Sequence, residues 1–523
     1  MSPTGTLSRR SFIGSAALAA AVAAHGPVAF AEEGEATWDE EHELVVIGSG
    51  GALFAALAAH KEGRDVVVFE KRGVYGGAMF LSAGAIWAPN NNMMSAENKA
   101  DESAEKCLSY LKEIDLYGSH DESLMADWIS KCNSIYDYII DELDVPLGEH
   151  GFAPHDYYDY PHTGVGRTIW IPDGEGNTAN HAVCWNDTMA PVVDASGLDI
   201  RLSTPVTRLV TEGDAVVGVV AETADGQELR VHATKGVIIA TGSFDHNQTM
   251  VGTYLMPPLV GSQIPESCTG DGHLMGMAVG ADIANMGYNY GCCLVDLGLD
   301  EQFASMNVLN NSIIVDKDGR RFCNETCSYD ELSHIFEDVS RNSQGHPYCY
   351  SGNVTGVYDS IGLSWAKKDP SDLPEYVREY ATLEELAEGE GLDKDVFMSE
   401  IERYNSMCEQ GVDEDFHRCE GPFDNPVNGL YGSFLELTPV STAPFYAATL
   451  GRGSLGTSGG LVVDENARVL RDGEPIEGLY ASGCASDALV TGYPGAGFPI
   501  AMAITRAFIA ADHALGLGIV KAE

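Results

Sequence analysis

The sequence predicts an α/β protein of two domains. One is built around a parallel sheet from both ends of the chain, and the other, of mixed α+β structure, is inserted between them. The chain has 523 residues, which is long for one small domain. Continuous apolar runs, typical of strands buried on both faces, begin at residues 44, 237 and 479. The acidic helical segment 383–408 lies between the last two runs and favours an inserted domain.

The first apolar run opens a strand–turn–helix–strand unit. Leu44–Ile47 leads into the glycine turn 48–52, and the alanine-rich segment 53–59 after it is typical of a helix. A second apolar run, 65–69, ends at Glu70. Such glycines let a backbone approach a pyrophosphate at the helix N-terminus, and an acid about 20 residues later accepts hydrogen bonds from a ribose. The unit therefore predicts a dinucleotide site.

Further buried strands extend this domain to the end of the chain. The run 202–206 leads into 216–220 as a hairpin, and 236–242 and 478–483 are strands that end in small residues. A helix over 500–515 follows the last strand. We therefore expect one domain from residues 42–288 and 440–523, with the inserted domain at 289–439.

Charge excludes several classes of partner. The chain has 78 acidic residues against 30 Lys and Arg, a formal net charge of −48. This balance argues against nucleic acid and anionic lipid as partners.

The N-terminus has the pattern of an export signal. Adjacent arginines at 9 and 10 precede an apolar, alanine-rich run, and Ala29-Phe30-Ala31 is typical of a cleavage site. We interpret residues 1–31 as a twin-arginine signal peptide, and expect export to the periplasm or the outer face of the envelope. The alternative, a retained anchor, needs about 20 apolar residues, and this run is interrupted at His25-Gly26-Pro27. After removal of the signal we expect no membrane span.

Twelve cysteines are present, without any Cys-x-x-Cys pair or Cys-x-x-Cys-His haem motif. The close sets are Cys292-Cys293 and Cys323-x-x-x-Cys327. Buried, inert thiols are the interpretation we favour, and an iron–sulfur cluster is the alternative. We predict no metal site.

Several motifs together resemble the FAD-dependent fumarate reductase/succinate dehydrogenase flavoprotein superfamily. They are the 48–52 loop with Glu70, Gly76-Gly77, and the segments 240–242, 269–272, 319–325 and 478–483. The resemblance implies a Rossmann-like FAD-binding domain and an inserted clamp domain that closes substrate against the flavin. It implies FAD contacts from Gly48, Ser49, Gly50, Ala52, Glu70, Gly77, Ala78, Met79, Ser82, Gly84, Val206, Ala240, Thr241, Gly242, Asp271, Gly483 and Ile500.

Three positions distinguish branches of this superfamily. Fumarate reductases hold two carboxylates with Arg and His side chains. At the matching positions this chain has Tyr329, Gly456 and Tyr493, which are neutral. The motifs around them, Arg-Phe-x-Asn-Glu-x-x-x-Tyr, Gly-Thr-x-Gly-Gly and Tyr-Pro-Gly-Ala-Gly, are similar to those of the 3-ketosteroid dehydrogenase branch. This likeness implies a small neutral carbonyl substrate.

The same resemblance implies roles in catalysis. The Tyr493 hydroxyl and the Gly497 N–H would polarise a carbonyl, as in an oxyanion hole. Tyr329 would transfer a proton at the α-carbon, while flavin N5 exchanges a hydride with the β-carbon. The branch also uses an earlier tyrosine. We assign Tyr158 to that role, and its neighbours Tyr157 and Tyr160 stay open.

Export suggests the direction of reaction. No nicotinamide is available outside the cytoplasm, so we expect reduction of an activated C=C bond in anaerobic respiration. Electrons would come from a membrane cytochrome or a quinone-linked partner. Two alternatives stay open. One is a fumarate- or urocanate-type reductase with an anion site rebuilt from His334 or Arg341. The other is a non-enzymatic flavin carrier, to which the departures at Leu53 and Cys484 point.

Overall fold

The structure is a computed structural model. It describes residues 32–33, 37–82, 84–115, 121–149, 155–171, 185–255, 259–295, 310–342, 354–362, 376–424 and 436–523. The predicted signal peptide, 1–31, lies outside these ranges.

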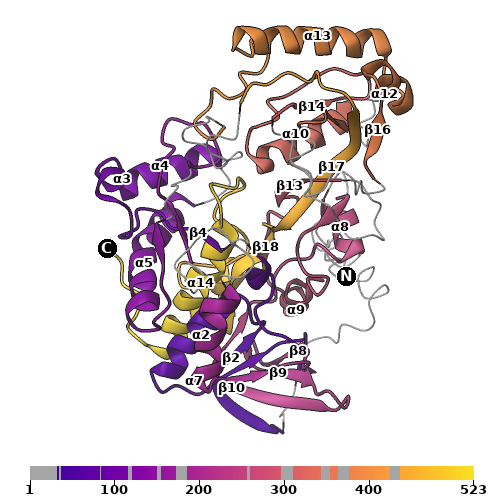
Figure 1. Cartoon of the computed structure of the whole chain (residues 1–523). Helices are drawn as coiled ribbons and strands as arrows, with labels where there is room; N and C mark the ends of the chain where they lie inside the picture. Colours follow the sequence, from indigo (N-terminus) through magenta and orange to yellow (C-terminus); the bar gives the residue numbers. More distant parts are fainter. Residues whose placement is uncertain are drawn as a thin grey trace, which may run out of the picture.

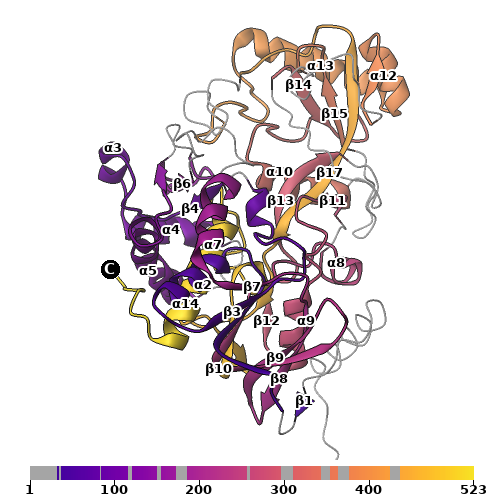
Figure 2. The same ribbon diagram turned by 60° about the horizontal axis from the view of Figure 1, so that its bottom comes forward.

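A nine-stranded mixed sheet forms the first domain (Figure 2). Its order is β1-β8-β9-β10-β2-β3-β7, with β20 beside β10 and β19 beside β20. A parallel run that ends at the edge strand β7 (Asp199–Arg201) also includes β2 (Glu40–Ile47), β3 (Val66–Phe69), β10 (Glu228–Ile239) and β20 (Glu474–Ala481). The others are β1 (Glu32–Glu33), β8 (Val206–Glu212), β9 (Ala215–Glu222) and β19 (Arg468–Arg471). β20 comes from the end of the chain, as predicted.

The continuous apolar run of β2 is explained by burial on both faces. Leu44 and Val46 pack into the core formed with the helices, whereas Val45 and Ile47 pack into the core on the other face. The helices of the first core are α2 (Ala52–Lys61), α4 (Ala104–Ile114), α5 (Glu122–Asp141), α7 (Ala190–Ser196) and α14 (Phe498–Leu515). In both ribbon views α14 lies beside α2 (Figures 1 and 2).

α14 is long and apolar enough to cross a membrane, the one such helix in the described ranges. Most of its length is buried inside the protein.

A six-stranded sheet forms the second domain, drawn at the top of Figure 1. Its strands are β11 (Gly261–Ser262), β13 (Asn289–Val295), β14 (Ser312–Val315), β15 (Val354–Tyr358), β16 (Arg378–Tyr380) and β17 (Phe445–Thr457). Its helices are α10 (Tyr329–Asn342), α12 (Leu383–Glu390) and α13 (Lys394–Gln410). α10 packs into the core on one face, and α12 and α13 pack into the core on the other.

The boundaries of this sheet differ from the prediction at two points. β17 pairs with β11, β13, β15 and β16, although the predicted boundary at residue 440 places it in the first domain. β11 also precedes the predicted boundary at 288. The reason is that β17, a 13-residue strand, runs from the second sheet down to the first domain (Figure 1). Its end nearest the first domain leads directly into β18 (Gly460–Leu461).

Smaller elements complete the fold. β18 pairs with β12 (Ile283–Ala284), and β4 (Ala85–Trp87) and β5 (Gly148–Glu149) pair with β6 (Thr168–Trp170). The remaining helices are α3 (Ala96–Ala100), α8 (Gln248–Tyr254) and α9 (Asp271–Ala278). Single turns are formed by η1 (Met79–Leu81), η2 (Trp185–Met189) and η4 (Gly483–Ala485).

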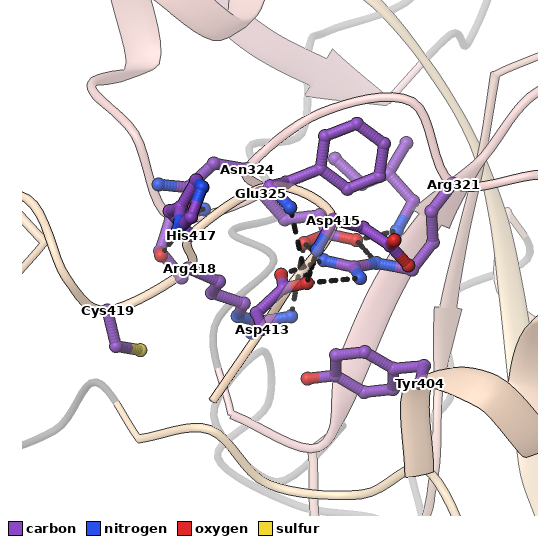
Figure 3. A network of polar contacts seen from close by, with 12 residues as sticks. Arg321, Asn324, Glu325, Tyr404, Asp413, Asp415, His417, Arg418 and Cys419 are labelled. Carbon is purple, nitrogen blue, oxygen red and sulfur yellow. Dashed lines mark hydrogen bonds and ion pairs between the residues drawn. The ribbon is translucent and has the colours of Figure 1, made fainter. Parts of the chain in front are cut away.

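A buried ion network holds the 319–325 motif in place (Figure 3). Arg321 donates to Glu325 at 2.7 Å and to Asp413 at 2.8 Å, and all three side chains are fully buried. Arg418 lies 3.3 Å from the Glu325 carboxylate. The ring of Tyr404 lies under the Arg321 guanidinium at 4.5 Å. These motif side chains are therefore structural, and they anchor the segment that leads into α10.

Candidate active site

A cavity of about 880 Å³ is lined by residues of both domains. The first domain contributes the carboxyl ends of β2, β3 and β10 and the N-termini of α2 and α14. The second contributes β13 and the first residue of α10. The cavity therefore lies at the carboxyl edge of a parallel sheet, the usual place for a ligand in such folds.

The glycine turn forms one end of the cavity. Gly48 has φ +101°, and a Cβ there would lie 2.3 Å from the Ala240 carbonyl oxygen, so this position requires glycine. The N-cap of α2, Gly51, has no side-chain cap. The first residues of the helix line the cavity, so the positive end of the helix dipole is directed toward it, which suits a pyrophosphate.

Glu70 lies beside this turn with its carboxylate held in place. Ser49 donates to it from both its backbone N–H and its hydroxyl, and the Arg72 N–H donates at 2.8 Å. The side chain is almost fully buried yet lines the cavity. A fixed acceptor next to an anion-binding turn fits a ribose followed by a pyrophosphate. These residues fit the nucleotide half of FAD.

Most predicted cofactor residues line this cavity. They are Gly48, Ser49, Gly50, Ala52, Glu70, Gly77, Ala78, Met79, Ser82, Val206, Ala240, Thr241, Gly242, Asp271, Gly483 and Ile500. Gly84 does not line it. The carbonyl of Gly84 instead accepts the Ile171 N–H at 3.3 Å, which joins β4 to β6.

The cationic side chains that line the cavity are near this nucleotide end. Lys71 donates to Asp271 at 2.7 Å and to Thr269 at 2.9 Å, and Arg72 follows Glu70 in the chain. No other described lining residue is Lys, Arg or His.

Three tyrosines meet in the cavity wall and form what we call its tyrosine end. Tyr157, Tyr329 and Tyr493 all line it, and their rings meet edge to face with centroids 4.9, 5.1 and 5.9 Å apart. The hydroxyls of Tyr157 and Tyr329 are hydrogen-bonded to each other. The three come from distant segments of the chain, and the tertiary structure brings them together.

The segment 492–497 supplies a second donor beside Tyr493. The Gly497 N–H points at the Tyr493 hydroxyl with N and O 3.4 Å apart. A Cβ on Gly497 would lie 2.1 Å from the Ala85 carbonyl oxygen, and its φ is +84°, so glycine is required. Gly497 is also the N-cap of α14, whose dipole adds positive potential. The two groups can together donate to one carbonyl oxygen.

Burial keeps the two phenols protonated. It raises the pKa of Tyr329 well above its usual value of 10, and the Tyr157 and Tyr493 hydroxyls raise it further. Burial likewise raises the pKa of Tyr493 to about 12, although hydrogen bonds with Tyr329 and Gly497 oppose the shift. At neutral pH both are therefore donors.

Tyr158, the predicted third catalytic tyrosine, does not line the cavity. Its hydroxyl points away and donates to the buried Asp330 carboxylate at 2.6 Å. The tyrosine of this stretch that reaches the cavity is Tyr157. Tyr160 stacks on Tyr158 with centroids 5.8 Å apart and lies outside the cavity. Consecutive residues here face opposite directions, so the choice between them needs the backbone geometry.

Part of the cavity wall was not predicted. Ile264, Leu455, Cys268, Cys292 and Cys293 give it an apolar or weakly polar surface. No motif marks these residues, because apolar wall positions need volume and not a particular functional group. Cys484, the departure seen in the sequence, also lines the cavity, and burial raises the pKa of its thiol.

The structure bears on two alternatives that the sequence left open: a rebuilt anion site and an iron–sulfur cluster. His334, proposed for a rebuilt anion site, lies 3.7 Å from Asp330 and 3.9 Å from Glu337 and does not line the cavity. The Arg341 side chain lies outside the described part of the structure.

Burial raises the pKa of the Cys292, Cys293, Cys323 and Cys327 thiols. Within the described ranges, no group of three or more His, Cys, Asp or Glu side chains could hold a metal ion.

Comparison with known proteins identifies the family of the chain. Residues 43–500 match the family described as FAD binding domain. The 3-oxosteroid 1-dehydrogenase of Mycolicibacterium smegmatis is 29% identical over 90% of this chain and 97% of its own. The urocanate reductase of Eggerthella lenta is 29% identical over 84% of this chain and 69% of its own. The solved 3-ketosteroid Δ1-dehydrogenase of Sterolibacterium denitrificans, in complex with 1,4-androstadiene-3,17-dione, superposes with a TM-score of 0.80. It is 25% identical and covers 91% of this chain and 99% of its own.

The fold and site thus define a flavoprotein of the fumarate reductase/succinate dehydrogenase superfamily, as the sequence motifs predicted. The chain belongs to the FAD binding domain family. It is an FAD-dependent oxidoreductase.

Proposed function

We propose that this protein reduces a C=C bond conjugated to a carbonyl group in a neutral, steroid-like substrate. The observation that supports this most is the tyrosine end of the cavity. Tyr157, Tyr329, Tyr493 and the Gly497 N–H converge there, whereas the cationic lining residues lie beside Glu70 and Asp271. A carboxylate substrate would need fixed cations that this end lacks in the described part of the chain.

The carbonyl oxygen would accept hydrogen bonds from the Tyr493 hydroxyl and the Gly497 N–H. This places two donors and the α14 N-terminus where negative charge develops as the β-carbon is reduced. Both donors are neutral, so they match a neutral ketone or lactone better than an anion. The apolar wall at Ile264 and Leu455 suits a hydrocarbon ring system.

Tyr329 would donate the proton to the α-carbon. Its raised pKa keeps the phenol neutral until substrate is bound, so that its proton is available for transfer to the α-carbon. The hydrogen bond with Tyr157 holds the Tyr329 hydroxyl in place within the cavity wall. When bound, reduced FAD would supply the hydride for the β-carbon. The substrate gains one hydride and one proton, and reduced FAD is oxidised, so the electrons balance.

The protonated state of Tyr329 favours the reductive direction. Oxidation of a saturated ketone would require a base at this position, and burial makes a phenolate costly. The urocanate reductase relative acts as a reductase, and the 3-oxosteroid relatives are named dehydrogenases.

Export and an electron partner are part of the same proposal. Residues 1–31 would direct the folded protein to the periplasm or the outer face of the envelope, where a membrane cytochrome or a quinone-linked partner reduces FAD. N-terminal sequencing of the protein from the envelope fraction checks this. A chain that begins at residue 32 supports export, and one that begins at Met1 contradicts it.

Anaerobic reoxidation of the reduced holoenzyme tests the reaction. We would follow flavin absorbance after adding a 3-keto-4-ene steroid, an unsaturated lactone, fumarate or urocanate. We expect reoxidation by the neutral compounds, and in Tyr329→Phe a rate at least about 100-fold lower with normal FAD content. Tyr160→Phe, outside the cavity, is the control and should keep the rate of the unmodified enzyme.

Other outcomes point elsewhere. Reoxidation by fumarate or urocanate, but not by the neutral compounds, would contradict the neutral-substrate proposal and favour a carboxylate reductase. Slow reoxidation by all four compounds would favour a flavin carrier or a different substrate class.

A further inference from the structure

We propose that Tyr158 and Asp330 form a buried positioning pair that sets the relative placement of the three cavity tyrosines. Neither side chain lines the cavity. The inference rests on the proposed function, because it assigns the pair a part in proton transfer by Tyr329. It follows from the hydrogen bonds behind the cavity wall.

On one side the pair holds the segments around Tyr157 and Tyr493. The Tyr158 hydroxyl donates to Asp330 Oδ2 at 2.6 Å and receives the backbone N–H of Tyr493 at 3.4 Å. The Tyr158 N–H donates to the Tyr110 hydroxyl at 3.2 Å, which in turn donates to the Pro494 carbonyl at 2.8 Å. The Tyr157 N–H donates to the same carbonyl at 3.0 Å. One layer of hydrogen bonds thus joins the two segments.

On the other side the pair holds the start of α10. Asp330 follows Tyr329 directly and is 1% exposed. Its Oδ1 accepts the Gly291 N–H from β13 at 2.6 Å, while Oδ2 accepts from Tyr158. The same carboxylate therefore fixes α10 to the second sheet and to the first domain. His334, one turn later, lies 3.7 Å from Oδ1.

Each cavity tyrosine is thereby attached to this network through its own backbone or its neighbour. Tyr157 precedes Tyr158, Tyr329 precedes Asp330, and Tyr493 donates its N–H to Tyr158. The Tyr158–Asp330 hydrogen bond joins the segment 155–171 to α10, which belongs to the other domain. A shift of about 1 Å between reacting groups can cost on the order of 100-fold in rate. Loss of this hydrogen bond should therefore reduce turnover without removing any group from the cavity.

Tyr158→Phe, Asp330→Asn and the double variant test the pair, with Tyr160→Phe as the matched control. We expect each single variant to lower the rate of reoxidation at saturating steroid enone by about tenfold or more. The steroid concentration giving half the maximal rate should change by less than about threefold, since the cavity wall is intact. The double variant should lose no more than the worse single variant, because both remove the same hydrogen bond.

A merely structural role would give a different pattern. It predicts lower melting temperatures with an unchanged reoxidation rate per bound FAD, and that result would overturn the proposal. Rates in Tyr158→Phe and Asp330→Asn within about twofold of the unmodified enzyme would also overturn it. If Tyr158→Phe does not fold, Asp330→Asn decides, because its single amide oxygen cannot accept from both Gly291 and Tyr158.

One readout does not depend on turnover and separates this inference from the proposed function. In protein labelled with 3-fluorotyrosine, the ¹⁹F resonance that disappears in Tyr329→Phe identifies Tyr329. That resonance should shift in Tyr158→Phe and in Asp330→Asn, and not in Tyr160→Phe. An unshifted resonance contradicts the pair. Failure of all neutral enones to reoxidise the unmodified enzyme, with a shifted resonance, contradicts the proposed substrate class alone.

Discussion

At the scale of single residues, the site depends on which of two neighbours faces the cavity. Tyr157 lines it and bonds to Tyr329, whereas Tyr158 turns to Asp330. Both are buried tyrosines in the same short stretch of the chain, so the sequence alone does not show which of them faces the cavity. The residues in strict motifs behave differently. Gly48 and Gly497 have positive φ and contact another backbone segment, and such positions are recognisable because no other residue fits.

Glu331 gives a pH-dependent prediction at this scale. Burial raises its pKa to about 7, while hydrogen bonds from Ser328 oppose the shift. Its pKa is therefore higher in the folded protein than the usual 4.5, and the stability it contributes is present below pH 4.5 and lost as pH rises through 7. From pH 5 to pH 8 the protein should lose on the order of 2 kcal/mol relative to Glu331→Gln.

Urea unfolding of both proteins at the two pH values measures this difference. Since all other titrating groups are shared, they cancel in the comparison. Parallel stability changes in the two proteins would contradict the raised pKa.

At the scale of elements, the 319–325 motif acts through structure. Arg321 and Glu325 lie in a fully buried network (Figure 3). The segment they hold continues into α10, which begins at Tyr329. The motif pointed correctly to the family, but its charged residues do not line the cavity. A sequence pattern cannot separate these roles, because a buried ion pair and a ligand site both require specific charged residues.

Glu325→Gln is the prediction for this element. The variant leaves Arg321 and Arg418 buried with one carboxylate fewer, so unfolding free energy should fall by about 3–5 kcal/mol. Asp415→Asn removes the surface pair with Arg403 and should change the unfolding free energy far less. Urea unfolding measures both. Equal losses in the two variants would show that the buried network is no stronger than the surface pair.

At the scale of the whole molecule, the cavity is assembled from distant parts of the chain. Gly48, Tyr329 and Ile500 line the same space, and the first sheet includes strands from both ends. Binding of FAD should therefore stabilise the entire fold and not one segment. Segments of both domains contribute to the wall, which is why neither domain alone defines the site.

Removal of FAD tests this coupling. The protein stripped of FAD should melt at a lower temperature than the holoenzyme. Added FAD at 100 times its Kd should restore about 2.7 kcal/mol of stability. In Gly48→Ala, where the Cβ meets the Ala240 carbonyl, FAD should give a smaller shift. A single melting transition with equal temperatures in both states would contradict the coupling.

The sequence by itself determined the family, the FAD cofactor and the two-domain α/β fold. These features depend on local patterns: buried strands with apolar runs, a glycine turn before a helix, and an acid at a fixed distance along the chain. It also pointed to Tyr329, Tyr493 and Gly497, which line the cavity, because each stands in a short motif. The tertiary structure decided what depends on distant contacts. It placed β17 in the second sheet, put Tyr157 in the cavity in place of Tyr158, and kept Gly84 out of the wall. Strand partners and the direction of a side chain follow from packing between segments far apart in the chain, which a local pattern does not contain.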